Sequence, residues 1–321
     1  MNVSIVAGGA GFIGSNLLPH LVTEGRVVLV LDNLCRGKES YIAEMNSSSI
    51  YFRNTELSTV NETMSAFEYA KTLGQVDEIW HLAANSDIPA GVMDAHVDLN
   101  DTFMTTFALL EAMKSYGIGT MHFASSSAIY GDLGDVTLHE SIGPLLPISN
   151  YGAMKLASEA LISSAAEAYL GRANLFRFPN VVGVPATHGV ILDFINKLAS
   201  APESLEVLGD GTQQKSYLHV SDLISAMLHI RQRNLENKVE VVNIGPIDTG
   251  VTVRWIANQV ISRVSPSADI VFGIGNKGWV GDVPKFNYST DLLQSYGWKP
   301  LLDSEAAVTQ AVDEIAKQQG F

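Results

Sequence analysis

The sequence predicts an α/β protein with a doubly wound parallel sheet and a smaller mixed α/β lobe. Two observations support this class. Short β-branched runs alternate with amphipathic stretches of helical period through the first half of the chain. A glycine-rich stretch directly follows the first of these runs, and an aspartate ends the second. Strand, glycine turn, helix, strand and acid in this order are typical of a βαβ unit in a parallel sheet.

Apolar periodicity, caps and turn residues place the elements along the chain. In the first half, strands are expected at 3–7, 27–31, 50–52, 78–84, 121–124 and 172–177, and helices at 15–22, 59–73, 103–116 and 151–169. In the less regular second half, helices are expected at 191–200, 221–231, 252–264, 291–296 and 304–318, and strands at 216–220, 239–244 and 270–273. Residues 1–178 and 216–245 are therefore predicted to form a Rossmann-type domain, and residues 179–215 and 246–321 a substrate-binding lobe.

The stretch 8–14 reads Gly-Gly-Ala-Gly-Phe-Ile-Gly and is predicted to hold a dinucleotide. Its glycines permit a tight turn and close approach of a pyrophosphate, and the following helix supplies a partial positive charge. Asp32 ends the next strand about 20 residues later, where its carboxylate can bind the adenosine ribose and repel a 2′-phosphate. NAD is therefore favoured over NADP, although Arg36 is placed where it could pair with that phosphate.

Two further stretches predict a catalytic site. Ser125 and Ser126 follow the strand at 121–124, at the carboxyl end where open α/β sheets bind ligands. Tyr151 and Lys155 stand four residues apart on a predicted helix, so their side chains share one face. The ammonium group can stabilise a phenolate, which would let the phenol act as acid and base below its usual pKa of about 10. Either serine could converge with Tyr151 on one substrate hydroxyl.

Composition excludes several classes of protein. The 321 residues are 46% apolar and 17% charged, which is typical of a globular chain, and the net charge of −14 argues against nucleic acid or an anionic membrane as a partner. The single cysteine, Cys35, precludes an internal disulfide and indicates a reducing compartment. No signal peptide, membrane span or metal site is recognised, so we expect a cytoplasmic protein.

Taken together, these stretches resemble the extended short-chain dehydrogenase/reductase family, and within it the NAD-dependent nucleotide-sugar epimerases and dehydratases, above all the UDP-glucose (UDP-galactose) 4-epimerases. The matching stretches lie at 8–15, 32–37, 81–84, 125–131, 151–155, 180, 209–212, 217–222, 243–245, 281–284 and 297–300. They cover the chain almost end to end in the family's order. The resemblance also implies a homodimer, formed through the helices at 103–116 and 153–169.

The resemblance implies roles for individual residues. The catalytic residues implied are Ser126, Tyr151 and Lys155. The implied cofactor contacts are Gly8, Gly11, Phe12, Ile13, Gly14, Asp32, Asn33, Arg36, Glu56, Leu57, Leu82, Ala83, Ala84, Ser86, Ala124, Ser125, Tyr151, Lys155 and Phe178. The implied substrate contacts are Ser126, Ser127, Asn180, His188, Val190, Val207, Lys215, Tyr217, Trp279 and Asp282, among which Lys215 and Trp279 replace frequent arginines and Val190 a frequent asparagine.

The same resemblance narrows the reaction. Sugar 4,6-dehydratases have an Asp-Glu pair where this chain has Ser127 and Ala128. Related decarboxylases have a glutamate, and 3,5-epimerases a cysteine, in place of Ala128. The remaining chemistry exchanges a hydride and a proton at one carbinol carbon, as in a 4-epimerase of UDP-glucose and UDP-galactose with a transient 4-ketose. The alternatives are an NAD(P)-dependent reductase of a keto-sugar or small carbonyl, and an inactive dinucleotide-binding sensor. The sugar and the nucleotide base stay open.

Overall fold

The computed structural model describes residues 1–321 apart from 44, 46, 234–235 and 276–286. Its main element is a seven-stranded sheet in the order β12-β7-β5-β4-β1-β2-β3. The strands are β1 (Asn2–Ala7), β2 (Val27–Asp32), β3 (Ile50–Asn54), β4 (Gln75–His81), β5 (Thr120–Ala124), β7 (Arg172–Arg177) and β12 (Val239–Asn243). The pairs from β3 through β7 are parallel, so their carboxyl ends meet at one edge. The predicted fold class is confirmed.

Contacts group the described chain into two units. One consists of Met1–Ile129, Ser149–Arg177 and Met227–Val242, and the other of Tyr130–Ile148, Phe178–Ala226 and Asn243–Phe321. These units differ from the predicted domains mainly at 130–148 and 216–226. The second stretch contains β11 (Tyr217–His219), which pairs with β8 (Asn180–Val182) in the second unit. Because of this pairing, β11 belongs to the second unit and is not a strand of the seven-stranded sheet, whereas the sequence analysis placed it in the Rossmann-type domain.

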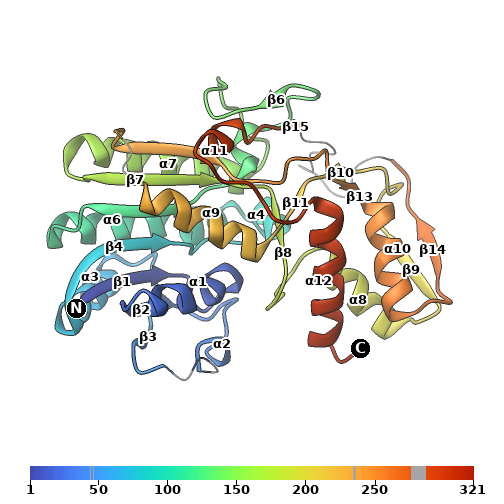
Figure 1. The fold of residues 1–321 in the computed structure, drawn as a ribbon, viewed down its shortest axis with the longest axis horizontal. Coiled ribbons are helices and arrows are strands. Elements are labelled where there is room, and N and C mark those ends of the chain that lie inside the picture. Colours follow the sequence, from blue (N-terminus) through green and yellow to red (C-terminus); the bar gives the residue numbers. More distant parts are fainter. Residues whose placement is uncertain (44, 46, 234–235, 276–286) are drawn as a thin grey trace. The chain divides into compact units, whose positions relative to one another are not determined.

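The first unit packs helices against its sheet. The helices of this unit are α1 (Phe12–Thr23), α2 (Ser40–Ala43), α3 (Val60–Leu73), α4 (Ile88–Met93), α5 (Ala95–Asp98), the π-helix η1 (Leu99–Met104), α6 (Thr105–Tyr116) and α7 (Asn150–Ala168). One hydrophobic core joins α3, α6 and α7 to residues such as Ile5, Leu29 and Phe123 of the strands. Figure 1 shows α6 and α7 alongside these strands. The predicted helix at 103–116 is divided, because its first residues belong to η1.

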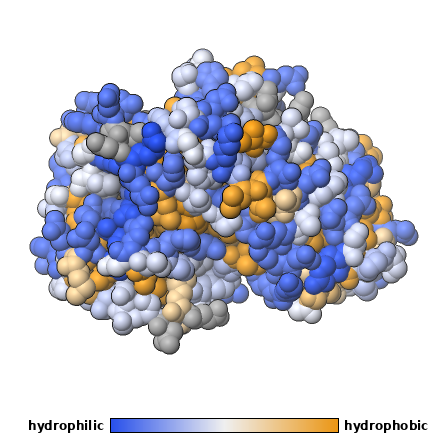
Figure 2. Space-filling view, viewed as in Figure 1, coloured by the Kyte–Doolittle hydropathy of each residue, from blue (hydrophilic) through white to orange (hydrophobic). Residues whose placement is uncertain are grey.

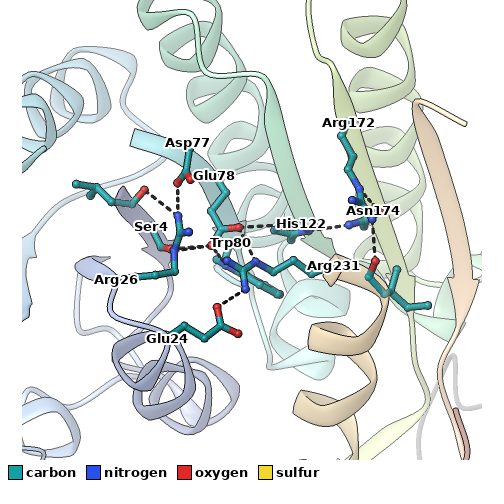
Figure 3. A network of polar contacts seen from close by, with 12 residues as sticks. Ser4, Glu24, Arg26, Asp77, Glu78, Trp80, His122, Arg172, Asn174 and Arg231 are labelled. Carbon is teal, nitrogen blue, oxygen red and sulfur yellow. Dashed lines mark hydrogen bonds and ion pairs between the residues drawn. The ribbon is translucent and has the colours of Figure 1, made fainter. Parts of the chain in front are cut away.

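The opposite face of the sheet has a buried polar network instead of a purely apolar layer (Figure 3). The carboxylate of Glu78 accepts hydrogen bonds from Ser4 Oγ at 2.7 Å and Arg231 Nε at 2.7 Å. Arg26 bonds Ser4 and Asp77 in the same network. Burial raises the pKa of Glu78, but His122 and the two arginines outweigh it and hold that pKa well below its usual range.

The second unit has its own core. This core gathers α8 (Val190–Ser200), α10 (Val253–Val264) and α12 (Ser304–Gln318). Its remaining described elements are short strands, in the pairs β8–β11, β9 (Ser204–Val207) with β14 (Asp269–Phe272), β10 (Gln214–Lys215) with β13 (Val251–Thr252) and β6 (Thr137–Leu138) with β15 (Asn287–Tyr288), and the helix α11 (Asp291–Ser295). The helix α9 (Val220–Gln232) and the 3₁₀-helix η2 (Ser127–Tyr130) each have residues in both units.

One face of the surface is largely polar. On the face drawn in Figure 2, hydrophilic residues predominate and hydrophobic ones form separate patches. Within the described ranges, none of the helices has the length and apolar character needed to span a bilayer.

Candidate active site

The glycine turn lies at the carboxyl end of β1 and leads into α1. Gly8 has φ +78°, and a Cβ on it would lie 2.6 Å from the backbone nitrogen of Ala83, so a larger residue would displace the end of β4. A Cβ on Gly14 would lie 2.5 Å from Gly8 O. Gly11 is the N-cap of α1 and gives its first turn no side-chain cap. The N–H groups of that turn, at Phe12 and Ile13, can therefore bind an anion.

Asp32 ends β2 beside this turn. Its Oδ2 accepts a hydrogen bond from Ala10 N at 3.0 Å, and its Oδ1 accepts one from Leu34 N at 2.9 Å. Burial raises the pKa of Asp32, and the two backbone hydrogen bonds oppose that shift. Asn33 donates from Nδ2 to Glu56 Oε2 at 2.9 Å, so these two predicted cofactor contacts are hydrogen-bonded to each other.

Two predicted cofactor contacts have other partners. Arg36 forms an ion pair with Asp87, with 2.6 Å between Nη2 and Oδ2. The Arg36 guanidinium is therefore already paired with a carboxylate, whereas binding the 2′-phosphate of NADP would need it to be available. Leu57 is 4% exposed and belongs to the hydrophobic core of the unit.

The carboxyl end of β4 borders the glycine turn. Leu82, Ala83, Ala84 and Ser86 are partly exposed there, as a ligand-lining segment requires. Asn85 is buried and fixes the segment, because its N–H donates to Thr102 Oγ1 at 3.1 Å and its Nδ2 to Asp98 Oδ1 at 2.9 Å.

The serine cluster at the end of β5 separates into different roles. Ser125 is 1% exposed and donates from Oγ to Glu159 Oε1 at 2.5 Å, so its hydroxyl points into the protein. Ser126 is partly exposed and shares a hydrogen bond with Tyr151. Ser127 is 6% exposed. Between the two serines that the sequence leaves open, the geometry therefore selects Ser126 as the partner of the phenol.

Tyr151 and Lys155 occupy the first turns of α7. Ser149 caps this helix, accepting a hydrogen bond from Gly152 N at 3.1 Å. Lys155 is 1% exposed, its Nζ donates to Ala124 O at 2.6 Å, and Nζ lies 5.8 Å from the centroid of the Tyr151 ring. The spacing of four residues thus places both groups at the carboxyl end of β5.

The electrostatics differ from the sequence-based expectation. Desolvation raises the pKa of Tyr151 to about 12; the hydrogen bond with Ser126 lowers it and the charge of Asp98 raises it. Desolvation also lowers the pKa of Lys155 to about 7, against the charges of Glu159 and Asp98. The neighbouring lysine therefore does not by itself make the phenol acidic, because burial disfavours both charged forms.

The predicted substrate contacts at 180–217 belong to the second unit. Asn180 and Tyr217 stand opposite each other in the β8–β11 pair; Asn180 is exposed and Tyr217 is 5% exposed. Lys215 lies on β10, paired with Val251. Phe178 is partly buried and directly follows β7.

The other predicted substrate contacts vary in exposure. His188 is exposed, with Nδ1 3.0 Å from Thr187 Oγ1, and Val190 begins α8. Val207 is 3% exposed and belongs to the core of the second unit. Trp279 and Asp282 lie outside the described residues.

Residues 4–245 match the NAD dependent epimerase/dehydratase family, which is more than half of the chain. The chain belongs to this family. It is therefore an NAD-dependent epimerase/dehydratase family enzyme, and the predicted family group and cofactor are confirmed. The partly exposed first turn of α1, without a side-chain cap, and the carboxylate at the end of β2 fit that cofactor.

Comparison with three known proteins shows that the similarity extends over nearly the whole chain. A UDP-glucose 4-epimerase of Lacticaseibacillus casei is 32% identical over 320 residues, covering 93% of this chain and 92% of that protein. A crystal structure of a UDP-galactose 4-epimerase has a TM-score of 0.85 at 33% identity and covers 99% of both chains. The UDP-glucose 4-epimerase of Thermus thermophilus in complex with NAD has a TM-score of 0.84 at 27% identity, covering 98% of this chain and 99% of that one.

The sequence analysis did not identify the charged residues around Tyr151 and Lys155. Arg177, the last residue of β7, binds Glu159 with both Nε, at 3.0 Å, and Nη2, at 2.6 Å. Glu159 continues the face of Tyr151 and Lys155 by one more step of four residues, and that spacing is a signal in the sequence. Asp98 has no comparable local signal, because η1 and the end of β4 determine its surroundings.

Proposed function

We propose that this family member is a 4-epimerase of a nucleotide sugar of the UDP-glucose/UDP-galactose type, acting through a 4-keto intermediate. The observation that carries the proposal is the arrangement of Ser126, Tyr151 and Lys155 at the carboxyl end of β5. The next two side chains, Ser127 and Ala128, offer no further acid or base for expelling water. The relatives named as UDP-glucose and UDP-galactose 4-epimerases support the same reaction.

The residues of the first unit have defined roles in this proposal. NAD, when bound, supplies the acceptor and then the donor of the hydride at carbon 4 of the sugar. The glycine turn, Asp32 and the segment 82–86 hold that cofactor. Ser126 hydrogen-bonds the oxygen on carbon 4, and Tyr151 removes the proton from this oxygen and later returns it.

Lys155 is the electrostatic partner of the phenol. The hydrogen bond to Ala124 O anchors its Nζ, so little movement is needed when negative charge develops on Tyr151. With a pKa of about 7, Lys155 is partly protonated near neutrality. Burial raises the pKa of Tyr151, and a positive charge close to the phenol lowers it, because it stabilises the phenolate.

The remaining residues of the proposed site belong to the second unit and to the undescribed segment. Asn180, His188, Val190, Lys215 and Tyr217 are proposed to hold the nucleotide sugar, together with Trp279 and Asp282. Lys215 would bind a diphosphate oxygen as a point charge, without the two-pronged geometry of an arginine. We further propose a homodimer.

The proposal is tested by incubating the purified protein separately with UDP-glucose, UDP-galactose and UDP-N-acetylglucosamine and following the 4-epimers by proton NMR. We expect interconversion of UDP-glucose and UDP-galactose without added NADH. Tyr151→Phe should abolish it, while Tyr169→Phe, at the other end of α7, should leave it nearly unchanged. Consumption of NADH with a keto-sugar, and no epimer from any substrate, would favour the reductase instead.

A further inference from the structure

Asp98 is a buried carboxylate, and one of its two oxygens has no hydrogen-bond partner among the described residues. It ends α5 and has no exposed surface. Oδ1 accepts the hydrogen bond from Asn85 Nδ2 at 2.9 Å. Oδ2 has no hydrogen-bond partner anywhere in the described part of the chain. A buried carboxylate without a full set of partners is costly to fold, so its presence requires a reason other than stability.

Oδ2 of Asp98 is packed against Gly91, a residue that is hydrogen-bonded to the start of α7. A Cβ on Gly91 would lie 1.8 Å from Asp98 Oδ2, so only a glycine leaves room for the carboxylate there. The carbonyl oxygen of Gly91 accepts a hydrogen bond from Asn150 Nδ2 at 2.8 Å. Asn150 directly precedes Tyr151 in α7. Asp98 is therefore packed against α4, whose Gly91 is hydrogen-bonded to the start of α7.

Two carboxylates, Asp98 and Glu159, act on Lys155, and of these Asp98 lacks an ion pair among the described contacts. Glu159, the other carboxylate acting on Lys155, already has Arg177 and Ser125 as partners. Asp98 has the field of Lys155 but no ion pair with it among the described contacts. The charged and titratable groups around the cluster are Tyr151, Lys155 and Glu159 of α7, Arg177 of β7, His81 of β4 and Asp101 of η1; α4 contributes none.

We propose that Asp98 is a positioning residue whose buried charge increases the protonated fraction of Lys155 and opposes the ionisation of Tyr151. It does not touch the reacting atoms; it acts through the other two groups. The unpaired charge of Asp98 lowers the stability of the folded state, and in return it sets the protonation of Tyr151 and Lys155. The kinetic consequence rests on the proposed function, whereas the consequences for protonation and stability do not.

The first test compares Asp98→Asn with the unaltered protein, without substrate. Asparagine keeps the shape and the acceptor for Asn85 but removes the unpaired charge. We expect an unfolding midpoint in urea at pH 7 that is equal or higher. Since burial raises the pKa of Asp98 above its unfolded value of about 3.9, the gain should grow as pH rises through that value and vanish below it. A less stable variant would mean that Asp98 is structural, and would overturn the proposal.

The second test measures the protonation of Lys155 directly. NMR of protein labelled with ¹³C at the lysine ε-carbons, with Lys155→Met to assign the signal, should show a lower pKa of Lys155 in Asp98→Asn, by about one unit. Asp94→Asn is the matched control: it neutralises the exposed N-cap of the same helix, and asparagine caps as well as aspartate. It should leave Lys155 unchanged. An unaltered Lys155 in Asp98→Asn would contradict the proposal.

The third test uses the pH dependence of epimerisation. Because the charge of Asp98 raises the pKa values of both Tyr151 and Lys155, its removal should move both limbs of the bell-shaped profile to lower pH, by about one unit. Limbs that stay in place or move to higher pH would refute the assignment. If no sugar is epimerised at all, the proposed function fails, and the NMR and unfolding measurements still decide the role of Asp98.

Discussion

Nζ of Lys155 lies 2.6 Å from the carbonyl oxygen of Ala124, the last residue of β5. This bond connects α7 to the carboxyl end of β5. Among the described residues, this is the one hydrogen bond recorded for the three donors of the Lys155 ammonium group, and Lys155 is 1% exposed. A buried lysine with so few partners is suited to change its protonation state, and that property leads to the first prediction.

Lys155→Met should make the protein less active and more stable. The loss of the ammonium group removes the stabilisation of the phenolate, and kcat should fall by about a hundred- to ten-thousandfold. The folded pKa of Lys155, about 7, is below its unfolded value of about 10.4, so the lysine costs stability below pH 7 and the cost is relieved as pH rises between these values. Urea unfolding should therefore favour the variant at pH 6 more than at pH 10. The exposed Lys71→Met is the control, and a variant that is less stable at both pH values would argue against this account.

Glu159→Gln should destabilise the folded state through Arg177. The two side chains are each 6% exposed, and Arg177 donates to Glu159 through both Nε and Nη2, so the substitution breaks a buried two-point ion pair. The expected loss is about 3–5 kcal/mol in the free energy of unfolding. The double variant Glu159→Leu/Arg177→Met removes both charges and should recover most of it. If the double variant lost as much as the single one, the ion pair would not be the cause.

The sequence predicts the site better where its parts are local. The turn at Gly8 and the four-residue spacing of Tyr151 and Lys155 depend on neighbours in the chain, and both lie at the carboxyl ends of their strands as expected. The choice between Ser125 and Ser126 depends on a glutamate 34 residues away, and sequence patterns carry no information on that contact.

The pKa shifts of Tyr151 and Lys155 could not be predicted from the sequence, because they also depend on contacts between distant parts of the chain. A lysine four residues from a tyrosine suggests an acidic phenol, but the burial of both groups reverses the shift. Asp98 contributes from a short helix whose position depends on the end of β4 through Asn85. The parallel sheet followed from periodicity, whereas the assignment of residues 216–226 depended on the pairing of β11 with β8.

Asp32→Asn should weaken the preference for NAD over NADP. The carboxylate is held beside the glycine turn by Ala10 N, where its charge repels a 2′-phosphate. Loss of charged hydrogen bonds to the ribose should lower the affinity for NAD by about ten- to a hundredfold. Isothermal titration of protein stripped of cofactor would measure both dinucleotides. In this background, Asp87→Asn should release Arg36 from its ion pair and improve NADP binding further. Undiminished affinity for NAD in Asp32→Asn would place the ribose elsewhere.

Glu78→Gln should remove part of the stability of the first unit in a pH-dependent way. The carboxylate binds Ser4, Trp80 and Arg231 in the polar network of Figure 3, and its pKa is held below the unfolded value of about 4.3. Its contribution is therefore fully present above that value and is lost as pH falls toward the folded pKa.

At pH 7 the loss should be about 3 kcal/mol, at the lower end for a broken buried ion pair, because Arg26 and Arg231 keep Asp77 and Glu24 as second partners. As pH falls below about 4, the difference between the variant and the unaltered protein should shrink steadily, because the contribution of Glu78 is lost toward its low folded pKa. Glu68→Gln, which neutralises an exposed glutamate on α3, should change the free energy of unfolding by less than about 1 kcal/mol at either pH. A difference between Glu78→Gln and the unaltered protein that stays constant from pH 7 to pH 3 would show that shape, and not charge, makes Glu78 important.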